Sequence, residues 1–321
     1  MIEDGTIAAN DPARASSARF PVPAPSPAER RTRRRSVARR RFVNKVVTVG
    51  AWTAGAIGIF FMGWIVLTVV RRGIGAINWA FFTELPPGPG DPGGGLANAI
   101  VGTIVITFGA ALIGIPVGFF AAVYLAEFGR NGRIATAIRT ITNVVLGVPS
   151  IVAGLFAFAI LVRPLSHYSG FAGSVALAFI MLPVMTRTAE DILNLVPNDL
   201  RESALAIGAP RWKATMGVIV RSARGGLITG AILAVVRVSG ETAPLLFTAL
   251  SSPYWLEGLF GQSGYFGGPT ANLTKTVYDY ATSPYQNWQD LAWGGALVII
   301  VTVLGMNILA RLIFQRGKEW H

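Results

Sequence analysis

The chain has 321 residues, of which 52% are hydrophobic and 14% are charged, with a formal net charge of +12 at pH 7. The apolar residues gather into long runs, a distribution typical of membrane proteins and unlike that of a soluble enzyme. The absence of cysteine excludes disulfide bonds and thiolate metal sites, and the two histidines lie far apart in the sequence. We therefore expect no metal centre.

The amino-terminal segment holds most of the net charge. Residues 1–45 carry 11 Lys or Arg side chains against four acidic ones, with prolines between Pro21 and Pro27 and arginines between Arg30 and Arg41. Few of these residues build a core. The sequence therefore predicts a disordered cytoplasmic tail that lies against anionic membrane lipid, without a nucleic-acid partner.

Six apolar runs follow within residues 46–321. In chain order they are Val46 to Val70, Leu96 to Ala126, Thr140 to Val162, Leu165 to Thr186, Gly225 to Leu250 and Leu291 to Ala310. Each is long enough to cross a bilayer as a helix, the structure that satisfies its own backbone hydrogen bonds in lipid. The sequence predicts an all-α polytopic membrane protein with six transmembrane helices.

The connecting segments indicate the orientation of these helices. Segments on one side, including both ends of the chain, hold 23 Lys or Arg residues, and the alternate segments hold four. Basic residues of short loops are retained on the cytoplasmic side. Both termini are therefore predicted to be cytoplasmic.

The fifth run contains two charged residues, Arg237 and Glu241. Each lies about ten residues from the nearer end of the run, which places both near the bilayer midplane, where a charge costs several kcal/mol. A spacing of four brings both side chains onto one helical face. They either neutralise each other or share a ligand.

Gly240 and Pro244 lie beside this pair. Pro244 has no N–H for the carbonyl of Gly240, and glycine is flexible, so the helix is predicted to kink or open here. Irregular backbone at membrane depth is tolerated where it lines a cavity. Other prolines and small-residue pairs are interpreted as packing features: Pro116, Pro149, Pro183, Gly114/Gly118 and Gly226/Gly230.

Two loops are distinctive. In the basic loop after the fourth run, Asn198 or Asp199 is a candidate helix cap, Glu202 completes a capping-box spacing, and Gly208 supplies the stop. We expect a short amphipathic helix near residues 198–208, either in a groove of a partner protein or on the membrane surface. The opposite loop, Ser251 to Asp290, is rich in aromatic residues and is either a partner surface or an interfacial aromatic belt.

Two motifs resemble those of a known family. Glu202, Ser203, Ala204 and Gly208 resemble the Glu-Ala-Ala loop signature of bacterial ABC-importer permeases, with serine in place of one alanine. The stretch from Arg237 through Gly240, Glu241, Thr242 and Pro244 resembles the A-type phosphate-specific permeases of that family. The resemblance extends from about Val46 to the carboxyl end.

The resemblance implies the type I ABC-importer permease fold and a role in an ATP-driven inorganic phosphate importer of the bacterial cytoplasmic (inner) membrane. Implied partners are a C-type permease, an ABC ATPase dimer that binds ATP and Mg, and an extracytoplasmic phosphate-binding protein. None of the lysines stands in a P-loop, so this chain is expected to bind no cofactor and to be no enzyme on its own. Alternatives are a permease for sulfate or molybdate, or an ATP-independent channel or secondary transporter, although no internal repeat is visible.

The implied site residues fall into two groups. The substrate path is assigned to Arg237, Gly240, Glu241, Thr242 and Pro244, and coupling to the ATPase to Glu202, Ser203, Ala204 and Gly208. An arginine binds two phosphate oxygens at once, and a carboxylate accepts a proton that phosphate carries near neutral pH and sulfate lacks. The alternative is a permanent ion pair that only holds the helices together.

Overall fold

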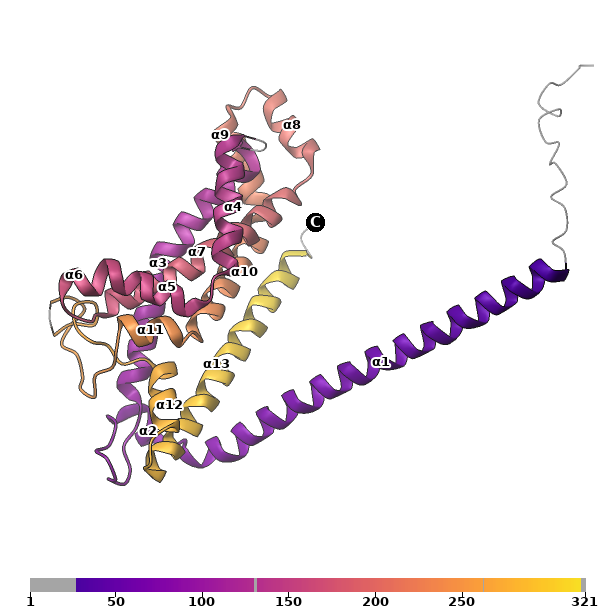
Figure 1. Cartoon of the computed structure of the whole chain (residues 1–321). Helices are drawn as coiled ribbons and strands as arrows, with labels where there is room; N and C mark the ends of the chain where they lie inside the picture. Colours follow the sequence, from indigo (N-terminus) through magenta and orange to yellow (C-terminus); the bar gives the residue numbers. More distant parts are fainter. Residues whose placement is uncertain (1–26, 130–131, 262, 319–321) are drawn as a thin grey trace, which may run out of the picture. The chain divides into compact units, whose positions relative to one another are not determined.

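The computed structural model describes residues 27–129, 132–261 and 263–318 and divides the chain into two compact units, Met1–Trp64 and Ile65–His321. Every regular element in the described ranges is a helix, which confirms the all-α prediction. Helix α1 (Pro27–Gly73) begins in the first unit and ends in the second (Figure 1).

Helix α1 includes residues 27–45, which composition had assigned to a disordered tail. The helix is consistent with the local sequence, because Pro27 suits a first helical position and neither proline nor glycine follows until Gly50. Arginine is itself a good helix former. The expectation for residues 1–26 lies outside the described residues.

Five helices are long and apolar enough to cross a membrane, and a bent pair provides up to one more. The five are Arg39–Ala76, Ala97–Gly129, Gly170–Asn194, Arg211–Ser239 and Gln286–Leu312, and the pair is Arg133–Gly147 with Ser150–Leu165, bent by 106°. Each of the six predicted runs overlaps one of these elements, although the fourth begins before Gly170 and the fifth continues past Ser239. Two runs, the third and the fifth, are not the single helices that we expected.

The remaining elements of the second unit follow in chain order. They are η2 (Ile74–Ala76), α2 (Trp79–Thr83), α3 (Ala97–Val123), η3 (Tyr124–Gly129), α4 (Arg133–Gly147), α5 (Ser150–Ala157), η4 (Phe158–Val162), α6 (Arg163–Leu165), α7 (Gly170–Asn194), α8 (Asn198–Ala206), α9 (Arg211–Ala214), η5 (Thr215–Ile219), α10 (Val220–Ser239), α11 (Ala243–Thr248), α12 (Leu273–Ala281) and α13 (Gln286–Lys318). The segments η3, η4 and η5 are π-helical.

Helix α7 is the centre of the larger core. The small-residue pairs predicted as close helix contacts, Gly114/Gly118 on α3 and Gly226/Gly230 on α10, all face it. A Cβ added at any of these four glycines would lie 2.9 to 3.1 Å from an α7 side chain. The absence of side chains lets both neighbouring helices approach α7 closely. Pro116 and Pro183 lie inside α3 and α7 without interrupting either helix.

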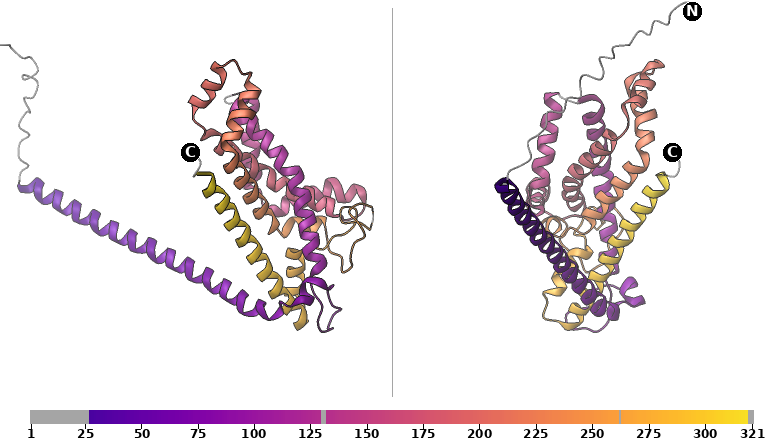
Figure 2. Two further views of the ribbon diagram at one scale, coloured as in Figure 1. Left: turned by 180° about the vertical axis from the view of Figure 1, so that it is seen from behind. Right: turned by 90° about the vertical axis from the view of Figure 1, so that its right-hand side faces the viewer.

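A second, smaller core joins α2, the start of α3, α12 and α13. It lies at the end of the unit opposite α8 and α9, a separation that Figure 1 and both views of Figure 2 show. Tyr280 of the aromatic loop is buried here, with its ring stacked on Trp288 at 4.5 Å. Other aromatic residues of the loop, including Tyr254 and Phe260, are exposed. The loop therefore divides its aromatic side chains between core and surface.

Candidate functional site

The predicted break beside Arg237 is confirmed. Helix α10 ends at Ser239, Gly240 adopts a non-helical conformation, and α11 begins at Ala243 with Pro244 in its first turn. Proline is well tolerated there, because the first N–H groups of a helix have no intrahelical acceptor. The fifth run is therefore two helices, and the long span ends at Ser239.

The opened backbone is held from another part of the chain. The Thr274 hydroxyl on α12 donates to the carbonyl of Glu241 at 3.0 Å, and the Glu241 N–H donates to the Val238 carbonyl. On the opposite side, α11 packs against α5 so closely that a Cβ at Gly154 would lie 2.6 Å from Cα of Pro244. These contacts make the break a defined structure.

Arg237 and Glu241 line one cavity of about 150 Å³, here called the central cavity. Its walls come from the end of α4, the start of α5, the middle of α7 and the break itself: Val145, Leu146, Val148, Ser150, Ala153, Ile180, Pro183, Val184, Arg237 and Glu241. The volume exceeds the roughly 10–15 Å³ that one water requires. The other predicted path residues, Gly240, Thr242 and Pro244, shape the break without lining the cavity.

The two charged side chains are not paired. Among the described residues, no contact of 4.0 Å or less joins the guanidinium of Arg237 to the carboxylate of Glu241. The reason is the break, because the helix ends at Ser239 and Glu241 no longer follows Arg237 by one helical turn. A permanent ion pair is therefore not what the structure shows.

The central cavity lies at the middle of the neighbouring span. Its lining residues Ile180 and Pro183 flank Met181, which packs against Gly114. Gly114 lies near the middle of the candidate span Ala97–Gly129. The cavity is therefore level with the middle of the span Ala97–Gly129, whereas Arg237 lies close to the end of its own span at Ser239.

The third predicted span contributes a wall of this cavity through its bend. Val148 and Pro149 are extended, and α5 leaves α4 at 106°. Pro149 cannot donate a backbone hydrogen bond, and the residue before a proline is driven out of the helical region. Pro149 is thus more than the packing feature that the sequence suggests, because it turns the chain and places Val148 and Ser150 in the cavity wall.

The predicted loop helix is α8, Asn198–Ala206. Its capping differs from the prediction, because Pro197 occupies the N-cap position and no side chain caps the helix. Asn198 instead accepts a hydrogen bond from Arg201. Gly208 has φ +79°, the left-handed conformation that ends helices and favours glycine, so the predicted stop is confirmed. Glu202 and Ser203 are exposed and Ala204 is buried.

Comparison with known proteins identifies the family. A family model described as "Binding-protein-dependent transport system inner membrane component" matches residues 114–318. The chain belongs to this family. It is 43% identical over 288 residues to the phosphate transport system permease protein PstA of Yersinia pestis, covering 90% of this chain and 95% of the relative. It is 45% identical over 280 residues to the PstA protein of Pasteurella multocida, covering 87% and 97%.

Solved structures agree on the fold. The inward-facing methionine ABC transporter MetNI aligns with a TM-score of 0.56 at 19% identity, over 69% of this chain and 95% of that chain. At this identity the likeness concerns the fold alone. The permease therefore has the architecture of ABC importer membrane subunits, as predicted.

The permease also carries a charged network that sequence reasoning missed. Arg201 of α8 forms an ion pair with Glu127 of η3 at 2.9 Å, and Arg139 of α4 forms one with Glu190 of α7 at 2.7 Å. Arg187 adds longer contacts to Glu190 and Asp191, at 3.8 and 3.5 Å. The partners Glu127 and Arg201 are 74 positions apart, and no local pattern relates them.

Metal ligation has no candidate in the described part of the permease. No group of three His, Cys, Asp or Glu side chains is placed there to hold an ion.

Proposed function

We propose that this chain is one of two membrane subunits of an ATP-driven importer of inorganic phosphate. The observation that carries the proposal is Arg237, which lines a cavity at mid-span depth without a hydrogen bond or ion pair to another described side chain. Its fork of N–H donors is available to an oxyanion and remains charged when desolvated. Both relatives named above are phosphate transport system permease proteins, which makes phosphate the oxyanion that we assign.

Glu241 supplies the selectivity in this proposal. Near neutral pH, phosphate retains a proton that the carboxylate accepts as a hydrogen bond, whereas sulfate has none to offer. A sulfate ion in the central cavity meets the repulsion of Glu241 without that compensation. Since Glu241 is not neutralised by Arg237, its charge remains available for this discrimination.

The other components are assigned by the same proposal. Energy comes from a separate ABC ATPase dimer that binds ATP and Mg and docks on α8 and its stop, the segment that carries Glu202, Ser203, Ala204 and Gly208. A C-type permease completes the translocation path, and an extracytoplasmic phosphate-binding protein delivers substrate on the side of α12. The chain is oriented with both termini in the cytoplasm of a bacterium, its basic segments against anionic lipid of the inner membrane.

Uptake of labelled phosphate tests the proposal. A strain lacking this gene is complemented with the wild-type chain, and uptake is measured with and without excess unlabelled phosphate, sulfate or molybdate. We expect uptake to return and to be competed by phosphate alone. Competition by sulfate or molybdate would assign a different oxyanion, and uptake that persists without the ATPase gene would refute ATP-driven import.

A further inference from the structure

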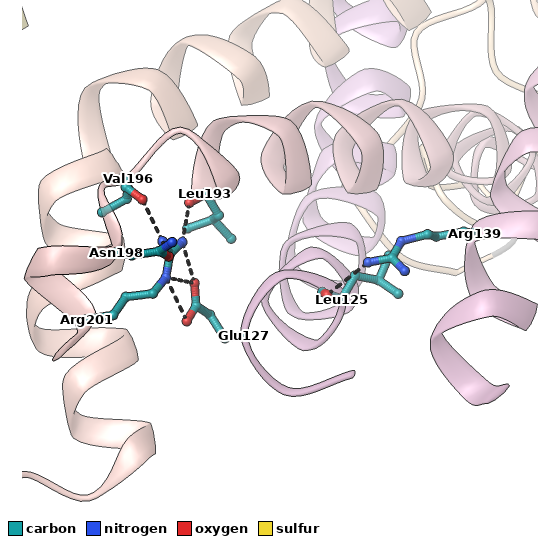
Figure 3. A network of polar contacts seen from close by, with 7 residues as sticks. All are labelled: Leu125, Glu127, Arg139, Leu193, Val196, Asn198 and Arg201. Carbon is teal, nitrogen blue, oxygen red and sulfur yellow. Dashed lines mark hydrogen bonds and ion pairs between the residues drawn. The ribbon is translucent and has the colours of Figure 1, made fainter. Parts of the chain in front are cut away.

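The π-helical segment η3 is held by arginines from two different elements. Arg201 of α8 donates to the carboxylate of Glu127, and Arg139 of α4 donates to the carbonyl of Leu125 at 3.1 Å (Figure 3). Both acceptors belong to η3, which continues α3. Single π-helical turns often mark functional sites, because they depart from the regular hydrogen-bond ladder. The segment thus connects α8 with α4.

Every nitrogen of the Arg201 guanidinium has an acceptor. Its Nε donates to the Glu127 carboxylate, one terminal nitrogen donates to the Val196 carbonyl and the Asn198 side chain, and the other donates to the Leu193 carbonyl and lies 2.9 Å from Glu127. Its side chain is 10% exposed and that of Glu127 is 7% exposed. A cation also suits the carboxyl end of α7, where unpaired carbonyls gather. Arg201 therefore ties α8 to two spans at once.

Packing alone does not provide this attachment. A cavity of about 340 Å³ lies between α8, η3 and η5, and Glu127, Arg201 and Leu205 are among the residues that line it. Unfilled space lacks the contacts that immobilise a packed interface. Within the described residues, every hydrogen bond between α8 and the α3–η3 span involves Arg201. The position of α8 relative to η3 thus depends on the polar network.

Arg139 extends the connection toward the central cavity. It joins α4 to η3 through Leu125 and to α7 through Glu190. The carboxyl-terminal end of α4 supplies Val145 and Leu146 to the wall of the central cavity, and its C-cap residue Val148 also lines it. Helix α4 is uninterrupted from Arg139 to this end, so movement at Arg139 displaces the cavity wall.

We propose that η3 transmits movement of α8 to the central cavity, with Arg201 and Arg139 as its positioning residues. This inference rests on the proposed function of α8 as the docking helix of an ATPase. Displacement of α8 moves Glu127 through Arg201, and η3 then moves α4 through Arg139. The wall of the cavity beside Arg237 shifts as α4 moves.

The test uses the complete transporter in liposomes, with phosphate-loaded binding protein on the side of the membrane where α12 lies. The variants are Arg201→Lys, Arg139→Lys and the double variant, since lysine keeps the charge and loses the planar fork. Arg224→Lys is the matched control, because Arg224 is exposed and makes no side-chain hydrogen bond or ion pair within the described residues. Phosphate transport, basal ATP hydrolysis and its stimulation by the binding protein are measured.

Each single variant is expected to lower the phosphate transported per ATP about tenfold, with basal hydrolysis unchanged. The double variant is expected to transport as much phosphate per ATP as the more strongly impaired single variant. The reason is that both residues act in one chain of contacts, so a second break in it adds no further loss. The control keeps wild-type coupling. Effects that multiply in the double variant, or single variants that keep wild-type coupling, would overturn the proposal.

A second variant separates transmission from stability. Arg201→Met/Glu127→Met removes both charges, so no unpaired charge is left buried, and replacing such a pair by apolar residues is often tolerated. We expect normal assembly but uncoupled hydrolysis. Restored coupling in this assembled double variant would show that the pair serves stability only. A wild-type transporter that moves no phosphate would refute the proposed function. The transmission through η3 would still be tested in that case, because stimulation of ATP hydrolysis by the binding protein can be compared between the wild type and the variants.

Discussion

The replacement of Arg237 by alanine separates substrate recognition from stability. Arg237 is exposed to the central cavity and makes no side-chain hydrogen bond or ion pair in the described part of the chain. Its removal therefore leaves no partner unsatisfied. None of the mechanisms that make a substitution strongly destabilising, such as an unpaired buried partner or a broken ion pair, therefore applies to this change. The variant is expected to accumulate and assemble normally.

The effect on transport is expected to be large. A hydrogen bond to a charged group contributes about 1.5–3 kcal/mol, so losing a bidentate contact to phosphate removes at least about 3 kcal/mol. This is a decrease of roughly 150-fold in occupancy or passage of the anion. Arg237→Lys keeps the charge but not the fork and is expected to lose about tenfold.

Labelled-phosphate uptake by complemented cells measures these effects, with the amount of membrane-inserted protein determined in parallel. The loss is expected in the maximum rate, because a binding protein that captures substrate sets the half-saturating concentration. Arg163→Ala is the matched control, since Arg163 is also exposed and lies outside the central cavity. Normal maximum uptake by Arg237→Ala would refute the assignment of Arg237 to the path.

Three further changes test other features. Glu241→Gln is expected to assemble normally and to allow sulfate to compete for phosphate uptake; unchanged selectivity would remove Glu241 as the discriminating group. Gly154→Leu is expected to destabilise the protein by about 1–3 kcal/mol in thermal unfolding, because its Cβ would lie 2.6 Å from Cα of Pro244. Gly154→Leu with an unaltered melting temperature would contradict the close packing of α5 on α11. Gly208→Val is strained by about 1–2 kcal/mol at φ +79° and is expected to lower ATPase coupling, unlike the matched Gly217→Val, where space is open.

Much of the fold could be predicted because the residues of each membrane helix are themselves enough to identify it. Each apolar run must satisfy its own backbone hydrogen bonds in lipid, so run length and composition identify helices without knowledge of their neighbours. The break at Gly240 and Pro244 was predictable for the same reason, since it follows from the missing N–H and from flexible backbone. Gly208 as the stop of α8 also followed from local conformation.

Other features had no comparable signal. Pro149 bends its span by 106°, whereas Pro116 and Pro183 leave their helices intact. The sequence does not distinguish the three prolines, because the outcome depends on the neighbouring helices that pack around each one. The caps expected at Asn198 or Asp199 do not form, because α8 begins one residue earlier than expected, with Pro197 at the N-cap and both residues inside the helix.

The sequence by itself determined that this is a helical membrane protein and that two charged residues lie beside a break in the backbone. Only the tertiary structure decided that Arg237 and Glu241 line a common cavity as separate charges. It also decided that Glu127 and Arg201, 74 positions apart, join the loop helix to a span. Local hydrogen bonding and hydrophobicity set helices residue by residue, whereas cavities and buried ion pairs depend on which distant segments pack together.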